Sequence, residues 1–244
     1  MQQKRLTVEE RADVRGLLIR SKPFTAMTEE ELSRLVDRTI RYDLSEGEVA
    51  FCEGSPAQRS LVVAEGAVAG VRYTENGDEK LFRCFKRGDI IGLTAMFLPE
   101  ACYLLTARIM RPTRVYGLPR EVLQEVAEVN SCFAARMLEY TSMRLRTSLN
   151  QVDFFTGSSA EQRVAAFLLQ LHEEQSSERI ELPFRQKQVA VLLGVREETV
   201  SRVLSQFRKA GVLAPGRGPI DLIDVDFLRD LVGGQREHLR IGSF

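Results

Sequence analysis

The chain has 244 residues, 44% of them hydrophobic, and its 34 basic and 34 acidic residues give a formal net charge of zero. This length exceeds the commonest domain size, so we expect two domains, each with enough apolar residues for its own core. Because no apolar run approaches the roughly 18–20 residues of a membrane span and no apolar signal segment opens the chain, the sequence predicts a cytoplasmic protein with no membrane partner.

Two short helices are predicted first, at residues 9–20 and, behind a capping box at residues 28–31, up to about Asp37. The chain then changes character. Over residues 41–118, short apolar strands such as LVVA and AVAGVRY alternate with glycines, and Asn76-Gly77 is a strong hairpin signal. Short strands with glycine turns at about 10-residue spacing predict a β-barrel or jelly roll.

A long helix is predicted next, because residues 121–155 contain neither glycine nor proline. Spacings of four and three, typical of a coiled-coil seam, run from Ala134 through a set that we assign to a dimer interface. That set is Leu138, Thr141, Leu145, Ser148, Val152 and Phe155. Since Thr141 and Ser148 interrupt the apolar pattern, the seam also fits a core. A neighbouring stripe of Phe133, Met137 and Tyr140 is predicted to pack on the barrel.

The long helix is predicted to break at residues 157–159, where Gly-Ser-Ser is followed by a capping box over residues 159–162. We place a hinge at this break.

A helix-turn-helix is predicted over residues 186–208. Ala190 lets two helices approach closely, and Gly194 permits the positive φ of a tight turn. Helical spacing turns a set of apolar residues inward: Val189, Leu193, Val195, Val200, Val203 and Leu204. It turns another set outward: Arg196, Glu197, Glu198, Ser201 and Arg202.

An ordinary helical hairpin would show the same close packing, so charge decides between the two interpretations. Residues 185–217 contain seven basic and two acidic side chains in a chain whose total charge is zero. Such a local excess attracts DNA phosphates. Gly211 and residues 213–223 then predict a helix stop and a hairpin, which would form a wing with Arg217 near its tip.

The run REETVSR, residues 196–202, resembles the recognition helix of the Crp/Fnr family of bacterial transcription regulators. That helix carries Glu-Thr-Val or Glu-Thr-Ile, then Ser or Gly, then Arg, and here Ser201 matches the Fnr branch, whose sites are TTGA-like. Glu197 departs from both branches, so the outermost base stays open. An arginine can donate two hydrogen bonds to guanine, and a glutamate can accept one from cytosine.

The resemblance assigns two groups of DNA contacts. The base-reading residues are Glu197, Glu198, Ser201 and Arg202. The phosphate contacts are Arg185, Lys187, Arg196, Thr199, Arg208, Lys209 and Arg217.

The barrel region resembles the same family, because its glycines and the run RGDIIG fall where the family's cyclic-nucleotide-binding-like sensor domain has them. The resemblance covers roughly residues 28–232 and implies an α+β fold. We expect N-terminal helices and a sensor β-barrel at residues 1–119, a dimerisation helix at 120–156 and a winged helix-turn-helix at 157–244.

The effector is not expected to be cyclic AMP. The family's cyclic-nucleotide binders carry Gly-Glu after RGDIIG and then an Arg-Ser or Arg-Thr pair, but Leu93, Tyr103 and Leu104 stand at these positions. A phosphate needs a cation or clustered N–H donors. The same region instead predicts a pocket for an uncharged or aromatic effector, lined by Leu93, Met96, Phe97, Tyr103, Leu104, Leu105, Ser148 and Leu149. The alternative is that these residues fill the core.

Metal cofactors have little support. The four cysteines form no CxxC pair, and Cys52 is the first of them, whereas the family's oxygen sensors hold iron–sulfur clusters largely through N-terminal cysteines. Neither His172 nor His238 lies in the sensor region, so a haem could be held there only by a cysteine. A redox response of Cys102 is a further alternative. We assign no metal site.

The sequence therefore predicts a homodimeric, effector-responsive regulator of transcription that binds palindromic TTGA-like DNA and has RNA polymerase as a further partner. No histidine, serine and carboxylate arrangement suggests an enzyme. The alternatives are a ligand-independent or redox- or haem-sensing regulator of the same fold, and a ligand module that does not bind DNA.

Overall fold

The computed structural model describes residues 3–73, 77, 79–182, 186–216 and 218–233. The chain divides into two compact units, Met1–Arg144 and Leu145–Phe244, which we describe separately. The boundary falls inside helix α4, Ser131–Gly157. The division into three parts at residues 119 and 156 stays a prediction.

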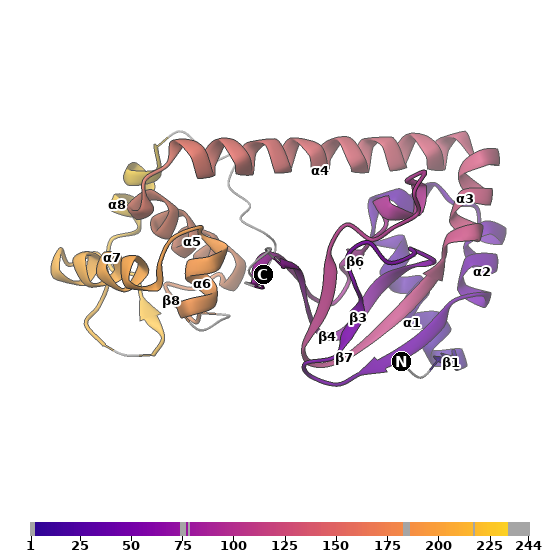
Figure 1. Ribbon diagram of the computed structural model, residues 1–244, viewed down its shortest axis with the longest axis horizontal. Helices are drawn as coiled ribbons and strands as arrows, with labels where there is room; N and C mark the ends of the chain where they lie inside the picture. Colours follow the sequence, from indigo (N-terminus) through magenta and orange to yellow (C-terminus); the bar gives the residue numbers. More distant parts are fainter. Residues whose placement is uncertain (1–2, 74–76, 78, 183–185, 217, 234–244) are drawn as a thin grey trace. The chain divides into compact units, whose positions relative to one another are not determined.

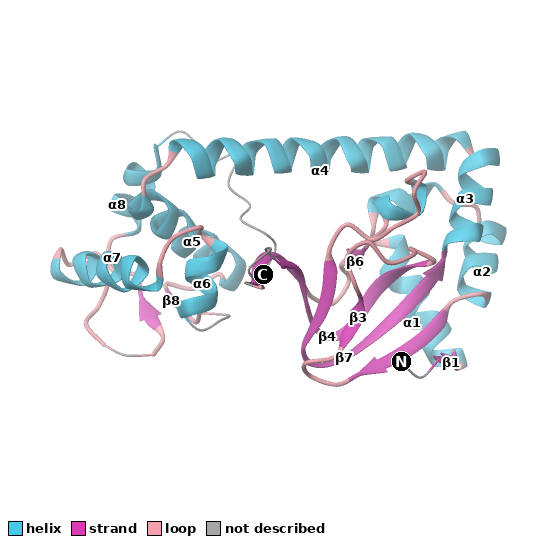
Figure 2. Cartoon of the chain, viewed as in Figure 1, coloured by secondary structure: helices cyan, strands magenta, loops and turns pink. Residues whose placement is uncertain are grey.

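An antiparallel β-sheet forms the centre of the first unit (Figures 1 and 2). Its path runs β1-β2-β7-β4-β5, while β3 pairs with β7 and β6 pairs with β4. The strands are β1 Gln3–Arg5, β2 Ile40–Leu44, β3 Val49–Phe51, β4 Arg59–Tyr73, β5 Glu79–Phe85, β6 Ile90–Ile91 and β7 Thr106–Pro119.

Strand β4 corrects one expectation, because LVVA and AVAGVRY belong to one strand and not to two. Gly66, expected to end a strand, lies inside β4 with φ +94°, and the pairing with β7 shifts register on both sides of it. A β-bulge accommodates such a glycine without ending the ladder. The predicted hairpin is confirmed by the β4–β5 pairing and by Gly77 with φ +80°, while Asn76 lies outside the described residues.

The helices of the first unit cover one side of the sheet, with α1 against β4 and both α2 and α3 against β7 (Figure 1). They are α1 Val8–Ile19, the 3₁₀ turn η1 Lys22–Ala26, α2 Glu29–Asp37, the 3₁₀ turn η2 Thr94–Phe97 and α3 Arg120–Val129. Both predicted N-terminal helices are confirmed. The capping box at Thr28 and Glu31 is present, as is a second at Thr7 and Glu10.

The expected single helix over residues 121–155 is wrong, because Asn130 separates α3 from α4 with φ −104° and ψ 93°. Its side-chain oxygen accepts a hydrogen bond from the Phe133 N–H at 2.9 Å. Its amide donates to the Ala26 carbonyl at 3.0 Å and to Glu31 at 2.8 Å. An asparagine side chain that bonds to nearby backbone in this way competes with the helix.

Two hydrophobic clusters use the two faces of the sheet. Alternate residues of β4 point opposite ways, so Leu61 and Val63 join one cluster while Val62 and Ala64 join the other, which the helices share. The helix-side cluster includes Phe133 and Met137 of α4, with Tyr140 packed against it. The stripe predicted to pack on the barrel is thereby confirmed.

The second unit is mostly helical. After α4 ends at Gly157, Ser159 caps α5 with Gln162 in the predicted capping box. The elements are α5 Ala160–Gln175, β8 Arg179–Ile180, α6 Gln186–Leu192, α7 Glu197–Lys209, β9 Ile220–Asp221 and α8 Val225–Val232. None of the helices in the described part of the chain is long and apolar enough to cross a membrane.

Candidate nucleic-acid interface

Helices α6 and α7 meet at the turn that the sequence predicts. Gly194 has φ +62°, and the Val195 N–H donates to the Ala190 carbonyl at 3.0 Å. Ala190 is buried where the helices cross, as are Val189 and Leu193. This burial agrees with the prediction that a small residue at position 190 lets the two helices approach closely.

Helix α7 has one buried and one exposed face. Val200, Val203, Leu204 and Phe207 are buried, and Phe207 makes an edge contact with Phe227 of α8 at 6.3 Å between ring centroids. The base-reading candidates Glu197, Glu198, Ser201 and Arg202 are all exposed. The inward and outward assignment of this helix is therefore confirmed, except that Val195 is only half-buried.

The residues predicted to contact phosphates differ in their exposure. Lys187, Arg196 and Lys209 are exposed, whereas Thr199 and Arg208 are half-buried. Arg185 and Arg217 lie outside the described residues, so their assignment stays a prediction.

The segment after α7 forms the predicted helix stop and hairpin. Gly211 has φ +77°, Leu213 bridges to Leu222, and the Ala214 N–H donates to the Asp221 carbonyl at 3.0 Å. Strand β9 also pairs with β8. This small sheet supports a wing beside α7 (Figure 1).

Arg163 of α5 also belongs to the site, although no sequence pattern predicts it. Its Nη1 donates to the carbonyls of Leu193 at 3.2 Å and Gly194 at 3.4 Å. Its Nε donates to the Ser158 carbonyl at 3.2 Å. One side chain thus joins the turn between α6 and α7 to the junction of α4 and α5. All three partners are backbone carbonyls, which any residue type supplies, so no sequence pattern marks them.

Comparison with known proteins covers both units. Residues 162–231 match the Crp-like helix-turn-helix domain, and residues 42–130 match the cyclic nucleotide-binding domain. The chain is 26% identical over 199 residues to the transcriptional activator protein anr of Pseudomonas aeruginosa, covering 80% of this chain and 81% of that protein. It is 25% identical over 221 residues to the fumarate and nitrate reduction regulatory protein of Escherichia coli, covering 88% and 87%.

The solved structure of FixK2 from Bradyrhizobium japonicum is similar as well, with a TM-score of 0.69 and 26% identity over 79% of this chain and 96% of that one. The chain belongs to the Crp/Fnr family of transcription regulators. Its helix-turn-helix makes it a DNA-binding regulator, and the regulators of this family are not enzymes.

Helix α4 is the predicted dimer helix, and its predicted seam is exposed in the single chain. Leu138, Leu145 and Val152 are 69%, 60% and 62% exposed. Thr141 and Ser148 are exposed too, and the side chain of Phe155 is outside the described residues. Such exposure removes the core as an explanation for the three aliphatic residues. The interface itself stays a prediction.

The residues predicted to line the effector pocket differ in how deeply they are buried. Leu93, Met96 and Tyr103 lie in the helix-side core cluster, which favours the alternative that they fill the core. Tyr103 is also fixed, because its hydroxyl donates to the Arg59 carbonyl at 2.6 Å and its ring stacks on Phe51. Phe97 and Leu105 are half-buried, and Leu104, Ser148 and Leu149 are exposed. The pocket stays a prediction.

No group of histidine, cysteine, aspartate or glutamate side chains within the described residues could hold a metal ion. Cys84 is buried, and this burial raises the pKa of its thiol to about 12. Cys102 is half-buried, and Cys52 is exposed. His172 is half-buried with Nδ1 2.8 Å from the Ser177 carbonyl, while His238 lies outside the described residues.

Proposed function

We propose that this regulator binds two-fold symmetric DNA sites with TTGA-like halves as a homodimer. The observation that carries the proposal is the exposed polar face of α7, which holds Glu198, Ser201 and Arg202 above a buried apolar face. Packing gives no reason for this set of side chains, whereas reading base edges in the major groove does.

Glu198 and Arg202 are four residues apart, so they lie about one turn apart on the same side of α7. An arginine in the major groove donates to the two acceptors of guanine, and a glutamate accepts from the amino group of cytosine. Both bases are available in a TTGA half-site and its complement. The pair therefore accounts for the inner part of the half-site, and Glu197 leaves the outermost base undefined.

A second copy of the chain follows from the small footprint of one helix. A single recognition helix reads only a few base pairs, and a two-fold pair doubles the site with centres about 34 Å apart. The exposed aliphatic residues of α4, Leu138, Leu145 and Val152, supply an apolar surface for that pairing.

An effector is part of the proposal. A small uncharged or aromatic molecule would contact Met96, Tyr103 and residues 148–149 and so favour one packing of the dimer helix. The hinge at residues 157–159 would then convert this change of packing into a rotation of the helix-turn-helix domains. Thermal unfolding of the purified protein against a library of small molecules tests this, since a ligand that prefers the folded state must raise the midpoint. RNA polymerase is the partner expected of a regulator whose bound form acts on transcription.

Competition binding at fixed salt tests the reading face. Arg202→Ala should cost about 1–3 kcal/mol on a TTGA-like palindrome and reduce discrimination against random DNA. Lys209→Ala is the matched control. Lys209 is an exposed cation at the C-terminal end of α7, and its loss should weaken binding to both DNAs alike. An equal loss on both DNAs for Arg202→Ala would contradict the base-reading assignment.

A further inference from the structure

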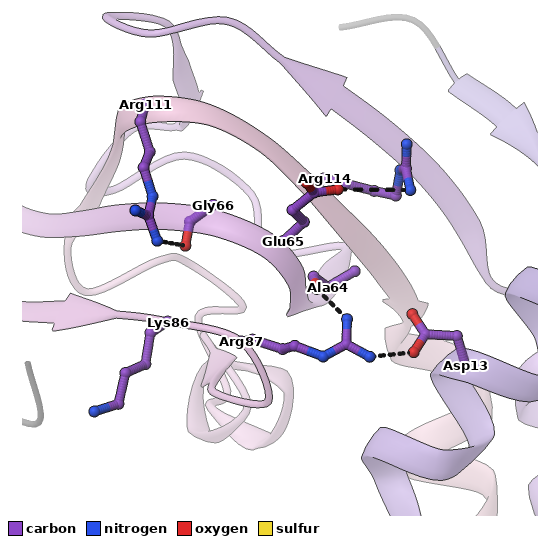
Figure 3. A pocket seen from close by; sticks show the side chains of 8 residues that line it. All are labelled: Asp13, Ala64, Glu65, Gly66, Lys86, Arg87, Arg111 and Arg114. Carbon is purple, nitrogen blue, oxygen red and sulfur yellow. Dashed lines mark hydrogen bonds and ion pairs between the residues drawn. The ribbon is translucent and has the colours of Figure 1, made fainter.

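The first unit carries a basic pocket that neither DNA binding nor dimerisation explains. It is lined by Asp13 of α1, residues 64–66 of β4, Lys86 and Arg87 of the β5–β6 turn, and Arg111 and Arg114 of β7 (Figure 3). The pocket has a volume of about 390 Å³. That volume lies in the range of ordinary small-molecule sites.

The β4 bulge builds this pocket. At Gly66, φ is +94° and a Cβ atom would collide with the Thr113 side chain and lie 2.6 Å from the Pro112 carbonyl oxygen, so only glycine fits. The register with β7 shifts on both sides of Gly66. Glu65 and Ala67, on either side of Gly66, pair with Arg114 and Arg111 of β7, so the bulge lies beside both arginines.

Backbone carbonyls orient two of the guanidinium groups. Arg87 donates to the Ala64 carbonyl and to the Asp13 carboxylate, and Arg111 donates to the Gly66 carbonyl at 3.2 Å (Figure 3). A carbonyl holds a guanidinium in place without cancelling its charge, and each guanidinium has five N–H groups. Both side chains therefore keep donors that a ligand can use.

The lining has an excess of positive charge, since Asp13 and Glu65 are its two acidic residues against one lysine and three arginines. The Arg114 guanidinium forms ion pairs with two carboxylates: its Nε lies 3.3 Å from Asp43 Oδ1, and its Nη1 lies 3.8 Å from Glu65 Oε2. For Arg111, the part of the chain that the structure describes provides no carboxylate within ion-pair distance. The Arg87–Asp13 pair is open to solvent, so a ligand can reach it.

We propose that this pocket binds a small molecule with at least two negative charges on phosphate or carboxylate groups. Guanidinium forks match both kinds of anion, with two parallel N–H···O bonds each. The pocket volume favours a small molecule over a protein surface, because an open pocket of this size can hold the anion between its basic side chains. The site is separate from the residues predicted for the effector.

Calorimetric titration of the full-length protein tests the site, with pyrophosphate and succinate as probes and sodium chloride matching the ionic strength. We expect saturable heat with at least one probe, and the probe that binds identifies phosphate or carboxylate as the ligand group. Arg111→Gln should weaken that binding about tenfold or more, because it removes a charge-assisted contact. Since Arg111 is exposed, the substitution should leave the fold intact.

Arg136→Gln is the matched control, because Arg136 is an exposed arginine of α4 that pairs with Glu139 and does not line the pocket. Its affinity for the probe should equal that of the native protein. Lys86→Gln gives a second variant within the pocket and should also weaken binding. Absence of saturable heat with both probes, or equal affinity in Arg111→Gln and the native protein, would overturn the proposal.

Discussion

The exposed face of α7 and the helix-side core of the first unit differ in how far packing explains their residues. On α7, Glu198 and Arg202 are exposed although Val200 and Val203 beside them are buried. In the first unit, the effector candidate Met96 is itself part of the core that the sheet and the helices share. A polar residue that packing does not require therefore indicates function, whereas an apolar residue in a sensor domain fits core and pocket equally well.

The largest expected effect concerns α4, the helix that both units share. Leu145→Glu would bury a carboxylate against its symmetry mate in the proposed seam, which is costly without a partner. The dimer should dissociate, and affinity for the palindrome should fall roughly 100-fold or more, because a single head contacts only half of the base pairs. Sedimentation velocity and competition binding on the same sample measure both effects.

Met143→Glu makes the same kind of change outside the seam. Met143 is 44% exposed and lies about 160° around the helix from Leu145. It should leave the dimer and its DNA affinity unchanged. If Leu145→Glu remains a dimer, or if both variants dissociate equally, the seam is not the interface and the exposed aliphatic residues need another explanation.

The next effect tests whether the reading face depends on a residue that carries no base contact. Arg163→Ala removes three hydrogen bonds to backbone carbonyls at Ser158, Leu193 and Gly194. We expect a loss of about 1.5–3 kcal/mol in the free energy of unfolding, since these bonds have a charged donor. Affinity for the palindrome should fall about tenfold and affinity for random DNA much less, because the turn that positions α7 loses its support.

Arg163→Lys should recover part of the loss, since a lysine keeps the charge but cannot span all three carbonyls. Arg229→Ala is the control within the same unit, because Arg229 pairs only with its neighbour Asp226 on α8 among the interactions described. A variant that is less stable yet reads the palindrome as the native protein does would show that Arg163 supports the fold and not the reading face.

The helix-turn-helix could be predicted from the sequence because the residues that specify it lie close together in the chain. Ala190, Gly194 and the apolar spacing on α7 specify the contact between two helices only a few residues apart, and the exposed residues follow from the same spacing. The role of Arg163 could not be predicted from the sequence, because its partners on the turn are carbonyls 30 and 31 residues away. Contacts between a side chain and distant backbone leave no pattern in a single sequence.

The two wrong boundaries have physical causes of the same kind. Asn130 ends α3 through bonds to Ala26 and Glu31, about a hundred residues earlier in the chain, so its local helical context was misleading. Gly66 suggested a turn, but the paired strand β7 continues past it and holds β4 together through a bulge. Both are cases in which tertiary partners determined an element's bounds against local preference.

The smallest expected effect is the absence of cyclic AMP binding by the first unit. Leu93 is buried where the family's cyclic-nucleotide binders carry glutamate, and Leu104 offers no donor. The Tyr103 hydroxyl already donates to the Arg59 carbonyl at 2.6 Å, so it is not available to a phosphate. Calorimetry with cyclic AMP up to millimolar concentration should give no saturable heat from this region. Because the single phosphate could enter the basic pocket, the titration is repeated with Arg111→Gln. Saturable heat with the same affinity in this variant as in the native protein would show that the barrel binds the nucleotide without the expected cation.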